Sequence, residues 1–131
     1  MTTPLRSAFV IDDNRMIATS LVNMLRLLGF EAYAAYGSLP AMQILGYSVP
    51  DIILLDIHLQ GVNGVDVCRF IRRDERLAHV PILAISSDTQ PELVADMRAA
   101  GANGFLSKPI EIDALEAAIQ AAQRDAFLSK R

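Results

Sequence analysis

Short apolar runs alternate along the chain with longer amphipathic stretches. Most of the short runs are apolar at consecutive positions, which is typical of strands covered on both faces, as in a parallel sheet. These runs are Ala8–Ile11, Phe30–Tyr36, Ile52–Leu55, Ile82–Ile85 and Gly104–Leu106. The run from Phe30 to Tyr36 differs because it contains Glu31 and several alanines, and it indicates a strand at the edge of the sheet.

The stretches between these runs have the periodicity of amphipathic helices. The predicted helices cover residues 14–28, 38–45, 64–73, 88–100 and 112–127. In the first, one face carries Ile17, Leu21, Met24, Leu25 and Leu28. We expect Gly29 to end the first helix, Ser38 to cap the second, Asn63 or Gly64 to begin the third and Pro91 to lie in the first turn of the fourth. Strand and helix thus alternate five times, which predicts an α/β fold: a doubly wound parallel sheet with helices on both faces.

Polar residues that could carry chemistry follow four of the predicted strands. Asp12 and Asp13 follow the first strand, Asp56 the third, Ser86 the fourth and Lys108 the fifth. In an open α/β sheet the functional site lies beyond the carboxyl ends of the strands, so we expect these side chains to converge there. Any one of these carboxylates could simply be a helix cap or a turn residue.

Three clustered carboxylates would repel one another and need compensation, which a divalent cation and an ammonium group would provide. Oxygen ligands without histidine or cysteine favour Mg²⁺. Lys108 is one of only two lysines, the other being Lys130 near the end of the chain. A solitary lysine opposite three carboxylates indicates a point charge that can reach an oxyanion.

Composition narrows the class of protein. The chain has 131 residues, of which 52% are hydrophobic and 21% charged, which suits one folded domain rather than a disordered chain. A net charge of −3 argues against a nucleic-acid or membrane-surface binder. The single Cys68 excludes an internal disulfide and a cysteine-based zinc site, and neither a signal peptide nor a membrane-spanning run is present. We therefore expect a soluble, cytoplasmic protein.

In this order and spacing, these residues closely resemble the receiver domain of bacterial two-component response regulators. The resemblance covers roughly residues 7–122. It rests on Asp12-Asp13, Asp56, Asn63-Gly64, Ser86, Gly104-Phe105 and Lys108-Pro109. It implies a flavodoxin-like fold with a five-stranded parallel sheet in the order 2-1-3-4-5, within a single domain over residues 1–131 whose last helix extends through 123–131.

The resemblance also implies a chemistry. Asp56 would be phosphorylated, with Mg²⁺ or Mn²⁺ held by Asp13, Asp56 and the backbone carbonyl of His58, and with Asp12 acting mainly through water. The donor would be a histidine kinase, a histidine phosphotransfer protein or a small acyl phosphate. Lys108 would neutralise phosphoryl oxygens as charge develops in the transition state. The domain would then be no enzyme in the usual sense, since it catalyses only its own phosphorylation and dephosphorylation.

Further residues would convert phosphorylation into a signal. Ser86 would hydrogen-bond a phosphoryl oxygen, and Phe105 would change rotamer to fill the space that Ser86 vacates. His58 and Asp88 would tune dephosphorylation by water, or would simply be surface residues. The output would be protein contacts made by the fourth helix, fifth strand and fifth helix, without direct binding to nucleic acid or membrane. The oligomeric state stays open.

The chain departs from the common family pattern at several places, including Ser87 at a position usually held by alanine or another small residue. Gln60-Gly61 replaces a proline turn four residues after Asp56 and indicates a more flexible loop. Ser86 replaces the commoner threonine and keeps its hydroxyl. Phe105 replaces the more frequent tyrosine, so coupling must depend on steric filling.

Surface assignments follow from the same patterns. Beyond its core face the first helix carries further apolar residues: Met16, Ala18, Val22 and Leu27. The resemblance implies that this helix meets the phosphodonor, through Asn14, Arg15, Ala18 and Val22, unless the apolar residues are merely exposed. We interpret the arginines at 69, 72, 73 and 76 as a solvated helix face, since acidic residues interleave with them. Cys68 is expected to pack inertly in the core.

Three functions compete. In the first, the chain is a stand-alone receiver, since no output module follows Phe127. In the second, it is a fragment of a larger response regulator or of a hybrid histidine kinase. In the third, it is an aspartyl-phosphate phosphatase of the haloacid-dehalogenase type, but that class needs Asp-x-Asp, whereas Ile57-His58 follows Asp56. A nucleotide-binding Rossmann domain is disfavoured further, because no G-x-G-x-x-G follows the first strand.

Overall fold

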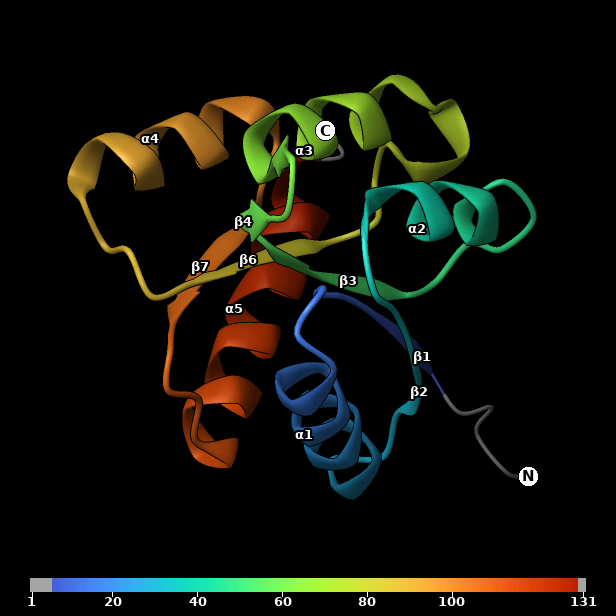
Figure 1. Cartoon of the computed structure of the whole chain (residues 1–131), viewed down its shortest axis with the longest axis vertical. Coiled ribbons are helices and arrows are strands. Elements are labelled where there is room, and N and C mark those ends of the chain that lie inside the picture. The colour runs from blue at the N-terminus through green and yellow to red at the C-terminus, as the bar shows by residue number, and fades with distance from the viewer. Residues whose placement is uncertain (1–5, 130–131) are drawn as a thin grey trace.

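A five-stranded parallel sheet forms the centre of the computed structural model, which describes residues 6–129 (Figure 1). Its strands are β1 (Ser7–Ile11), β2 (Glu31–Ala35), β3 (Ile52–Asp56), β6 (Ile82–Ser86) and β7 (Gly104–Ser107). They are ordered β2-β1-β3-β6-β7, and every neighbouring pair is parallel. This confirms the predicted flavodoxin-like order and places β2 at an edge, as the sequence of that strand indicates.

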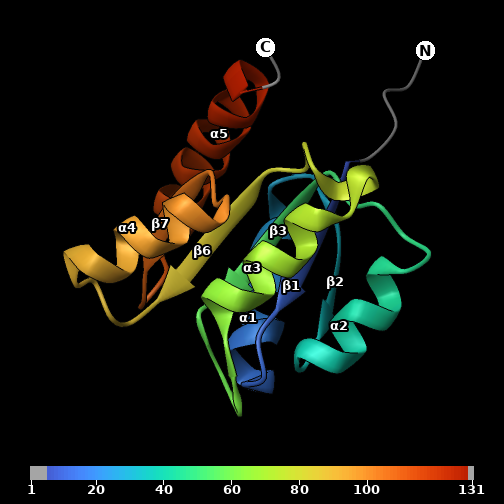
Figure 2. The ribbon, with the colours of Figure 1, turned by 90° about the horizontal axis from the view of Figure 1, so that it is seen from above.

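Five α-helices cover the two faces of the sheet. They are α1 (Arg15–Leu27), α2 (Ser38–Leu45), α3 (Gly64–Arg73), α4 (Pro91–Ala100) and α5 (Ile112–Ser129). Helices α1 and α5 lie on one face, and α2, α3 and α4 lie on the other (Figure 1, Figure 2). None of the helices described is long and apolar enough to cross a lipid bilayer.

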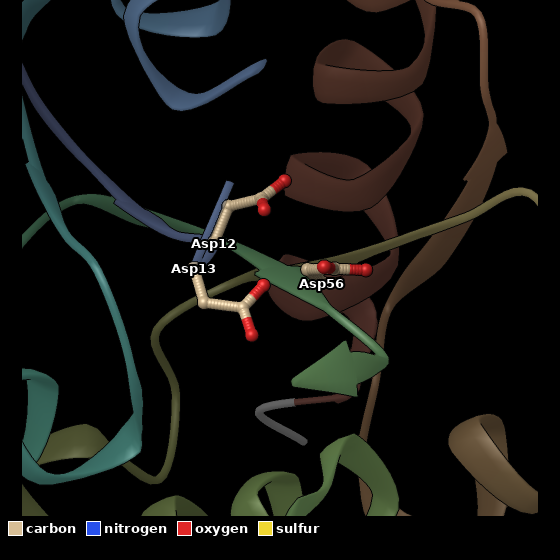
Figure 3. A group of neighbouring side chains, drawn as sticks. All are labelled: Asp12, Asp13 and Asp56. Carbon is tan, nitrogen blue, oxygen red and sulfur yellow. The ribbon is translucent and has the colours of Figure 1, made fainter. Parts of the chain in front are cut away.

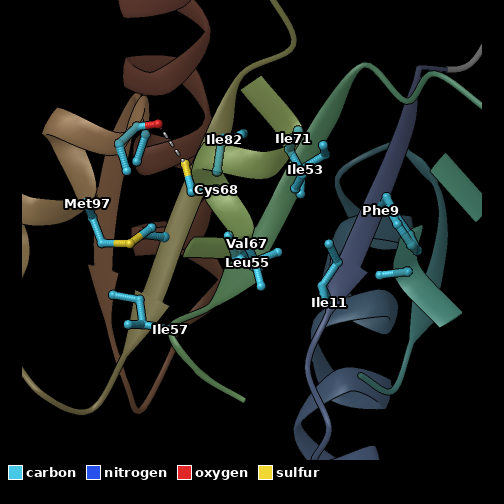
Figure 4. Close-up of a cluster of buried hydrophobic side chains, with 14 of the residues drawn as sticks. Phe9, Ile11, Ile53, Leu55, Ile57, Val67, Cys68, Ile71, Ile82 and Met97 are labelled. Carbon is cyan, nitrogen blue, oxygen red and sulfur yellow. Dashed lines mark hydrogen bonds between the residues drawn. The ribbon is translucent and has the colours of Figure 1, made fainter. Parts of the chain in front are cut away.

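The core has two layers because alternate residues of each strand point to opposite faces. On β3, Ile53 and Leu55 pack toward α3 and α4, whereas Ile52 and Leu54 pack toward α1 and α5. Every residue of this central strand is buried, including the final Asp56. Figure 4 shows the first layer, in which Cys68 lies fully buried and its thiol donates to the carbonyl of Ala100 (3.5 Å). Burial of apolar residues on both faces is the main stabilisation of such a sheet.

Several element boundaries differ from those predicted. Helix α2 begins at Ser38, but Gly37 takes the N-cap position and no side chain caps the helix. Helix α4 begins at Pro91, three residues later than predicted, because the side chains of Ser86 and Asp88 accept backbone N–H bonds within the preceding loop. Helix α5 runs to Ser129, past the periodic stretch 112–127 and into the predicted extension 123–131, whose last two residues lie outside the described residues.

Two short features are absent from the predicted pattern. A small antiparallel hairpin, β4 (His58–Leu59) and β5 (Val62–Asn63), lies between β3 and α3. A single 3₁₀ turn covers Glu75–Leu77. Neither has an apolar run long enough to be recognised, since two-residue strands carry almost no alternating pattern.

The buried stripe of α1 is wider than predicted: the predicted face packs against the core, and two further residues join it. Ala18 and Val22 are buried beside Leu21 and Leu25. These two residues therefore belong to the core and cannot meet a partner, contrary to the expectation for this helix. The small Ala18 side chain is fully covered, so the helix approaches the sheet closely there. Met16 and Leu27 are exposed, as are Asn14 and Arg15.

Arg72 corrects the interpretation of the arginine cluster. Its guanidinium donates to the carbonyls of Gly101 (3.0 and 2.8 Å), Leu77 (2.8 Å) and Val80 (2.7 Å), and to Oδ1 of Asn103 (2.8 Å). We call this set of hydrogen bonds the Arg72 clamp. It ties α3 to the segments that precede β6 and β7, so Arg72 is a structural residue and not part of a solvated face.

Candidate functional site

Three carboxylates meet at the carboxyl edge of the sheet. Asp12 and Asp13 directly follow β1, and Asp56 is the last residue of the neighbouring strand β3. Figure 3 shows the three side chains grouped at these strand ends. One carboxylate oxygen from each lies within 4.8 Å of the others. Asp12 and Asp56 are buried and Asp13 is half-buried, so only Asp13 gives the cluster a substantial open side. Parallel topology alone therefore assembles residues that are distant in sequence, as predicted.

Lys108 approaches the same cluster from the loop after β7. Its Nζ lies 3.3 Å from Oδ2 of Asp12 and 3.5 Å from Oδ1 of Asp56. Its backbone N–H donates to the carbonyl of Ser86 (2.9 Å), which holds the loop against the end of β6. The peptide bond to Pro109 is cis. Lys108 reaches both buried carboxylates at once, as the solitary lysine predicts.

The charges of these four side chains do not balance. Three carboxylates face a single ammonium, and the ligands on offer are all oxygen atoms. Oxygen donors of net negative charge suit a hard divalent cation such as Mg²⁺. The residues present therefore fit the cation that the sequence predicts.

Backbone N–H groups hold each carboxylate in place. Oδ1 of Asp12 accepts from the N–H of Asn14 (2.9 Å), and Oδ1 of Asp56 accepts from that of His58 (3.3 Å). Oδ2 of Asp13 accepts from the N–H of Gln60, at 2.6 Å the shortest of the three. The sequence motifs do not predict the bond from Gln60, because every residue except proline has a backbone N–H.

The ionised form of Asp56 is destabilised by its surroundings. Burial, followed by the negative charge of Asp12, raises the pKa of Asp56 above its usual range. The positive charge of Lys108 and the hydrogen bond from His58 act in the opposite direction and only partly compensate. The ionised carboxylate is thus poorly stabilised, which makes it a group that gains from a cation or from covalent modification.

The loop after β3 fits against the site through a close backbone approach. A Cβ on Gly64 would lie 2.5 Å from Cα of Ile57 and 2.7 Å from its carbonyl oxygen. The N–H of Gly64 donates to that same carbonyl (2.8 Å), and Oδ1 of Asn63 accepts from the N–H of Val65 to cap α3. Any side chain at position 64 would collide with the backbone of Ile57, which explains the glycine in the Asn63-Gly64 pair.

Ser86 and Phe105 lie on adjacent strands. Ser86 is fully buried at the end of β6, and its Oγ accepts from the N–H of Asp88 (2.9 Å). Phe105 pairs in register with Ala84, two residues before Ser86, so both side chains point to the face covered by α4. Phe105 is half-buried there and lines a narrow void together with Val94 of α4.

The remaining predicted site residues lie on the rim. His58 is exposed on β4, and its backbone carbonyl belongs to the segment that directly follows Asp56. Asp88 is half-buried in the loop before α4, where its Oδ1 accepts from the N–H of Gln90 (3.0 Å). Both therefore border the carboxylate cluster without being part of its buried centre.

A doubly wound parallel sheet with this acidic cluster and lysine at its carboxyl edge defines the receiver class of two-component signalling proteins. Residues 8–120 match the sequence model of the response regulator receiver domain, and the chain belongs to this family.

Individual relatives and solved structures are similar to this chain over most of its length. The polar-differentiation response regulator DivK of Brucella ovis is 27% identical over 107 residues, which cover 82% of this chain and 87% of DivK. A putative response regulator from Chloroflexus aurantiacus superposes with a TM-score of 0.86 at 26% identity, covering 92% of this chain and 99% of that one. NtrX from Brucella abortus superposes with a TM-score of 0.86 at 24% identity, but the match covers 97% of this chain and only 29% of NtrX. The fold thus occurs both in proteins of this size and within longer ones.

Proposed function

We propose that this chain is a phosphoacceptor in which Asp56 takes a phosphoryl group from a histidine on a partner protein or from a small acyl phosphate. One observation carries the proposal: a buried, ionisable carboxylate at the end of the central strand lies among two further carboxylates and 3.5 Å from a lysine. A single buried carboxylate without these neighbours would destabilise the fold, because its charge would be uncompensated. The group together is suited to phosphoryl transfer.

In the proposed reaction an oxygen of Asp56 attacks phosphorus in line with the leaving group. A bond forms between this oxygen and phosphorus, and the bond from phosphorus to the donor nitrogen or acyl oxygen breaks. Lys108 is in reach of an oxyanion at Asp56 and would neutralise part of the charge on the equatorial oxygens. The hydroxyl of Ser86 would donate to a phosphoryl oxygen after giving up its present bond with the N–H of Asp88.

We propose that Asp13, Asp56 and the backbone carbonyl of His58 hold Mg²⁺ or Mn²⁺, and that Asp12 contributes mainly through water. When bound, the cation would withdraw charge from the phosphoryl oxygens. Asp12 is more deeply buried than Asp56 and lies nearer to Lys108 (3.3 Å against 3.5 Å), which supports its indirect role. His58 and Asp88, on the rim, would tune attack by water on the phosphorylated form.

The signal would leave through the face that α4, β7 and α5 form. Ser86 and Phe105 point to the same side of adjacent strands, so movement of one changes the space open to the other. Phe105 has no hydroxyl, and filling of space must carry the coupling. A downstream protein would bind this face.

The proposed partners are therefore a histidine kinase or histidine phosphotransfer protein and a protein target. The proposed domain covers residues 1–131. It would serve either alone or as the receiver part of a larger regulator or hybrid kinase. A cytoplasmic location stays a prediction.

The test is incubation of the chain with Mg²⁺ and acetyl phosphate, followed by intact mass. We expect the mass of one phosphoryl group on the wild type and on Asp96→Asn, a control at an exposed carboxylate of α4. We expect none on Asp56→Asn, and none on the wild type in excess chelator. Labelling of Asp56→Asn at the rate of the control would show that another residue is the acceptor.

A further inference from the structure

The hairpin that follows β3 contacts the carboxylate cluster at its tip as well as through the N–H of His58 at its start. The N–H of Gln60, at the tip of the β4–β5 hairpin, donates to Oδ2 of Asp13 over 2.6 Å. These residues are 47 positions apart, so the bond ties the hairpin to the loop after β1. A hydrogen bond from an N–H to a carboxylate at this distance is of the strong, charge-assisted kind.

The turn leaves this N–H free to donate. Leu59 pairs with Val62, so Gln60 and Gly61 form a two-residue loop. Gly61 has φ +75°, and no non-glycine residue in the described part of the chain has a positive φ. A negative φ followed by a positive one corresponds to a type II turn, in which the N–H of the first central residue takes no part in the turn's own hydrogen bond. Gln60 therefore presents its N–H outward, toward Asp13.

Asp13 gains a partner from this N–H, at a position where the family more often has proline, which has no N–H. It is the least buried of the three carboxylates, and it lies within 4.8 Å of two others that carry the same charge. Lys108 contacts Asp12 and Asp56, so the ammonium group compensates those two directly. The N–H of Gln60 supplies the corresponding stabilisation for Asp13 and restricts rotation of its carboxylate.

We propose that the backbone N–H of Gln60 is a positioning group that orients Asp13 for the divalent cation. This inference rests on the proposed function, since it takes Asp13 to be a cation ligand. Partners that orient a metal ligand in this way typically change the affinity for the metal by about 10- to 100-fold when removed. The side chain of Gln60 is exposed and plays no part in the proposal.

Two substitutions at one position separate the N–H from the side chain. Gln60→Ala keeps the N–H, whereas Gln60→Pro removes it. Proline is favoured at the first central position of a type II turn, and the preceding Leu59 is in a strand, as a residue before proline prefers. Gln60→Pro should therefore preserve the turn while it deletes the bond to Asp13.

The experiment measures the affinity for Mn²⁺ alone, without any phosphodonor, by electron paramagnetic resonance of the free ion. We expect Gln60→Ala to match the wild type and Gln60→Pro to bind about 10-fold more weakly. Equal or tighter binding by Gln60→Pro would overturn the inference while leaving the cation site intact. No binding by the wild type would overturn the cation step of the proposed function and this inference with it.

A second measurement does not depend on the proline variant. In ¹H–¹⁵N spectra of the wild type, the amide proton of Gln60 should resonate well downfield, as expected for a short bond to a carboxylate. Asp13→Ala should move this resonance upfield, and Asp96→Asn should leave it in place. An unmoved Gln60 resonance in Asp13→Ala would show that the bond is not formed and would overturn the proposal.

Discussion

Replacing Asp56 by asparagine should stabilise the fold at neutral pH. The substitution keeps the shape of the side chain and an oxygen that can accept from the N–H of His58, but it removes a buried negative charge. At an effective dielectric constant of about 20, repulsion from each of the two carboxylates within 4.8 Å of Asp56 costs about 3.5 kcal/mol, and attraction to Lys108 at 3.5 Å returns about 5 kcal/mol. The difference leaves an expected gain of about 2 kcal/mol in the free energy of unfolding.

The gain in unfolding free energy from Asp56→Asn should depend on pH. The pKa of Asp56 is raised in the folded state, by burial and then by Asp12, so the folded protein binds this proton more tightly than the unfolded chain does. The unfolding free energy of the wild type therefore falls as pH rises from the unfolded pKa, about 4, through the raised folded pKa. Asp56→Asn lacks this group, so its advantage should be complete above that interval and should vanish below about pH 4.

Urea unfolding followed by circular dichroism, at a series of pH values and in chelator, measures the gain. Asp96→Asn removes an exposed carboxylate of α4 and should change stability by less than about 0.5 kcal/mol. A variant Asp56→Asn that is less stable than the wild type at neutral pH would refute the charge argument. A gain that persists unchanged below pH 4 would show that packing and not charge is responsible.

Three further predictions concern the residues around the site. Arg72→Met should lower the unfolding free energy by about 3 kcal/mol through loss of the clamp, whereas Arg73→Met, at an exposed neighbour, should change it by less than about 0.5 kcal/mol in urea titrations. Gly64→Ala should cost about 2 kcal/mol and slow labelling by acetyl phosphate, because its Cβ would displace Ile57; unchanged labelling would contradict this. Burial raises the pKa of Cys68 to about 11, so iodoacetamide at pH 8 should alkylate it only in urea, and rapid alkylation of the native protein would contradict its burial.

The sequence predicts the sheet and the site well because both follow from strand ends. Consecutive apolar residues identify β1, β3 and β6 as covered strands, and the polar residues at or just after the strand ends are then placed by topology alone. This is why Asp12, Asp13 and Asp56 could be grouped from residue types. The register of the first helix is harder, since apolar residues on adjacent faces leave more than one stripe open. The structure buries Ala18 and Val22, which lie outside the predicted stripe.

Backbone groups and long polar side chains are what sequence reasoning could not place. The N–H of Gln60 is present in any residue except proline, so only the turn geometry reveals its contact with Asp13. Arg72 has the same sequence environment as its exposed neighbour Arg73. Arg72 is structural because the fold brings the carbonyl of Gly101, 29 positions away, within hydrogen-bond distance of its guanidinium. Patterns along a chain record local periodicity and do not record such encounters.

The Arg72 clamp also constrains how α4 can move. Two bonds from the guanidinium end on the carbonyl of Gly101, directly after the last residue of this helix, whereas the opposite end begins at Pro91 after a loop of exposed and half-buried residues. A helix of 10 residues is about 15 Å long. With one end held, its rearrangement must be a swing about Gly101, in which displacement grows toward Pro91. The largest change would then occur beside Ser86, and the far end of the helix would act as a fixed pivot.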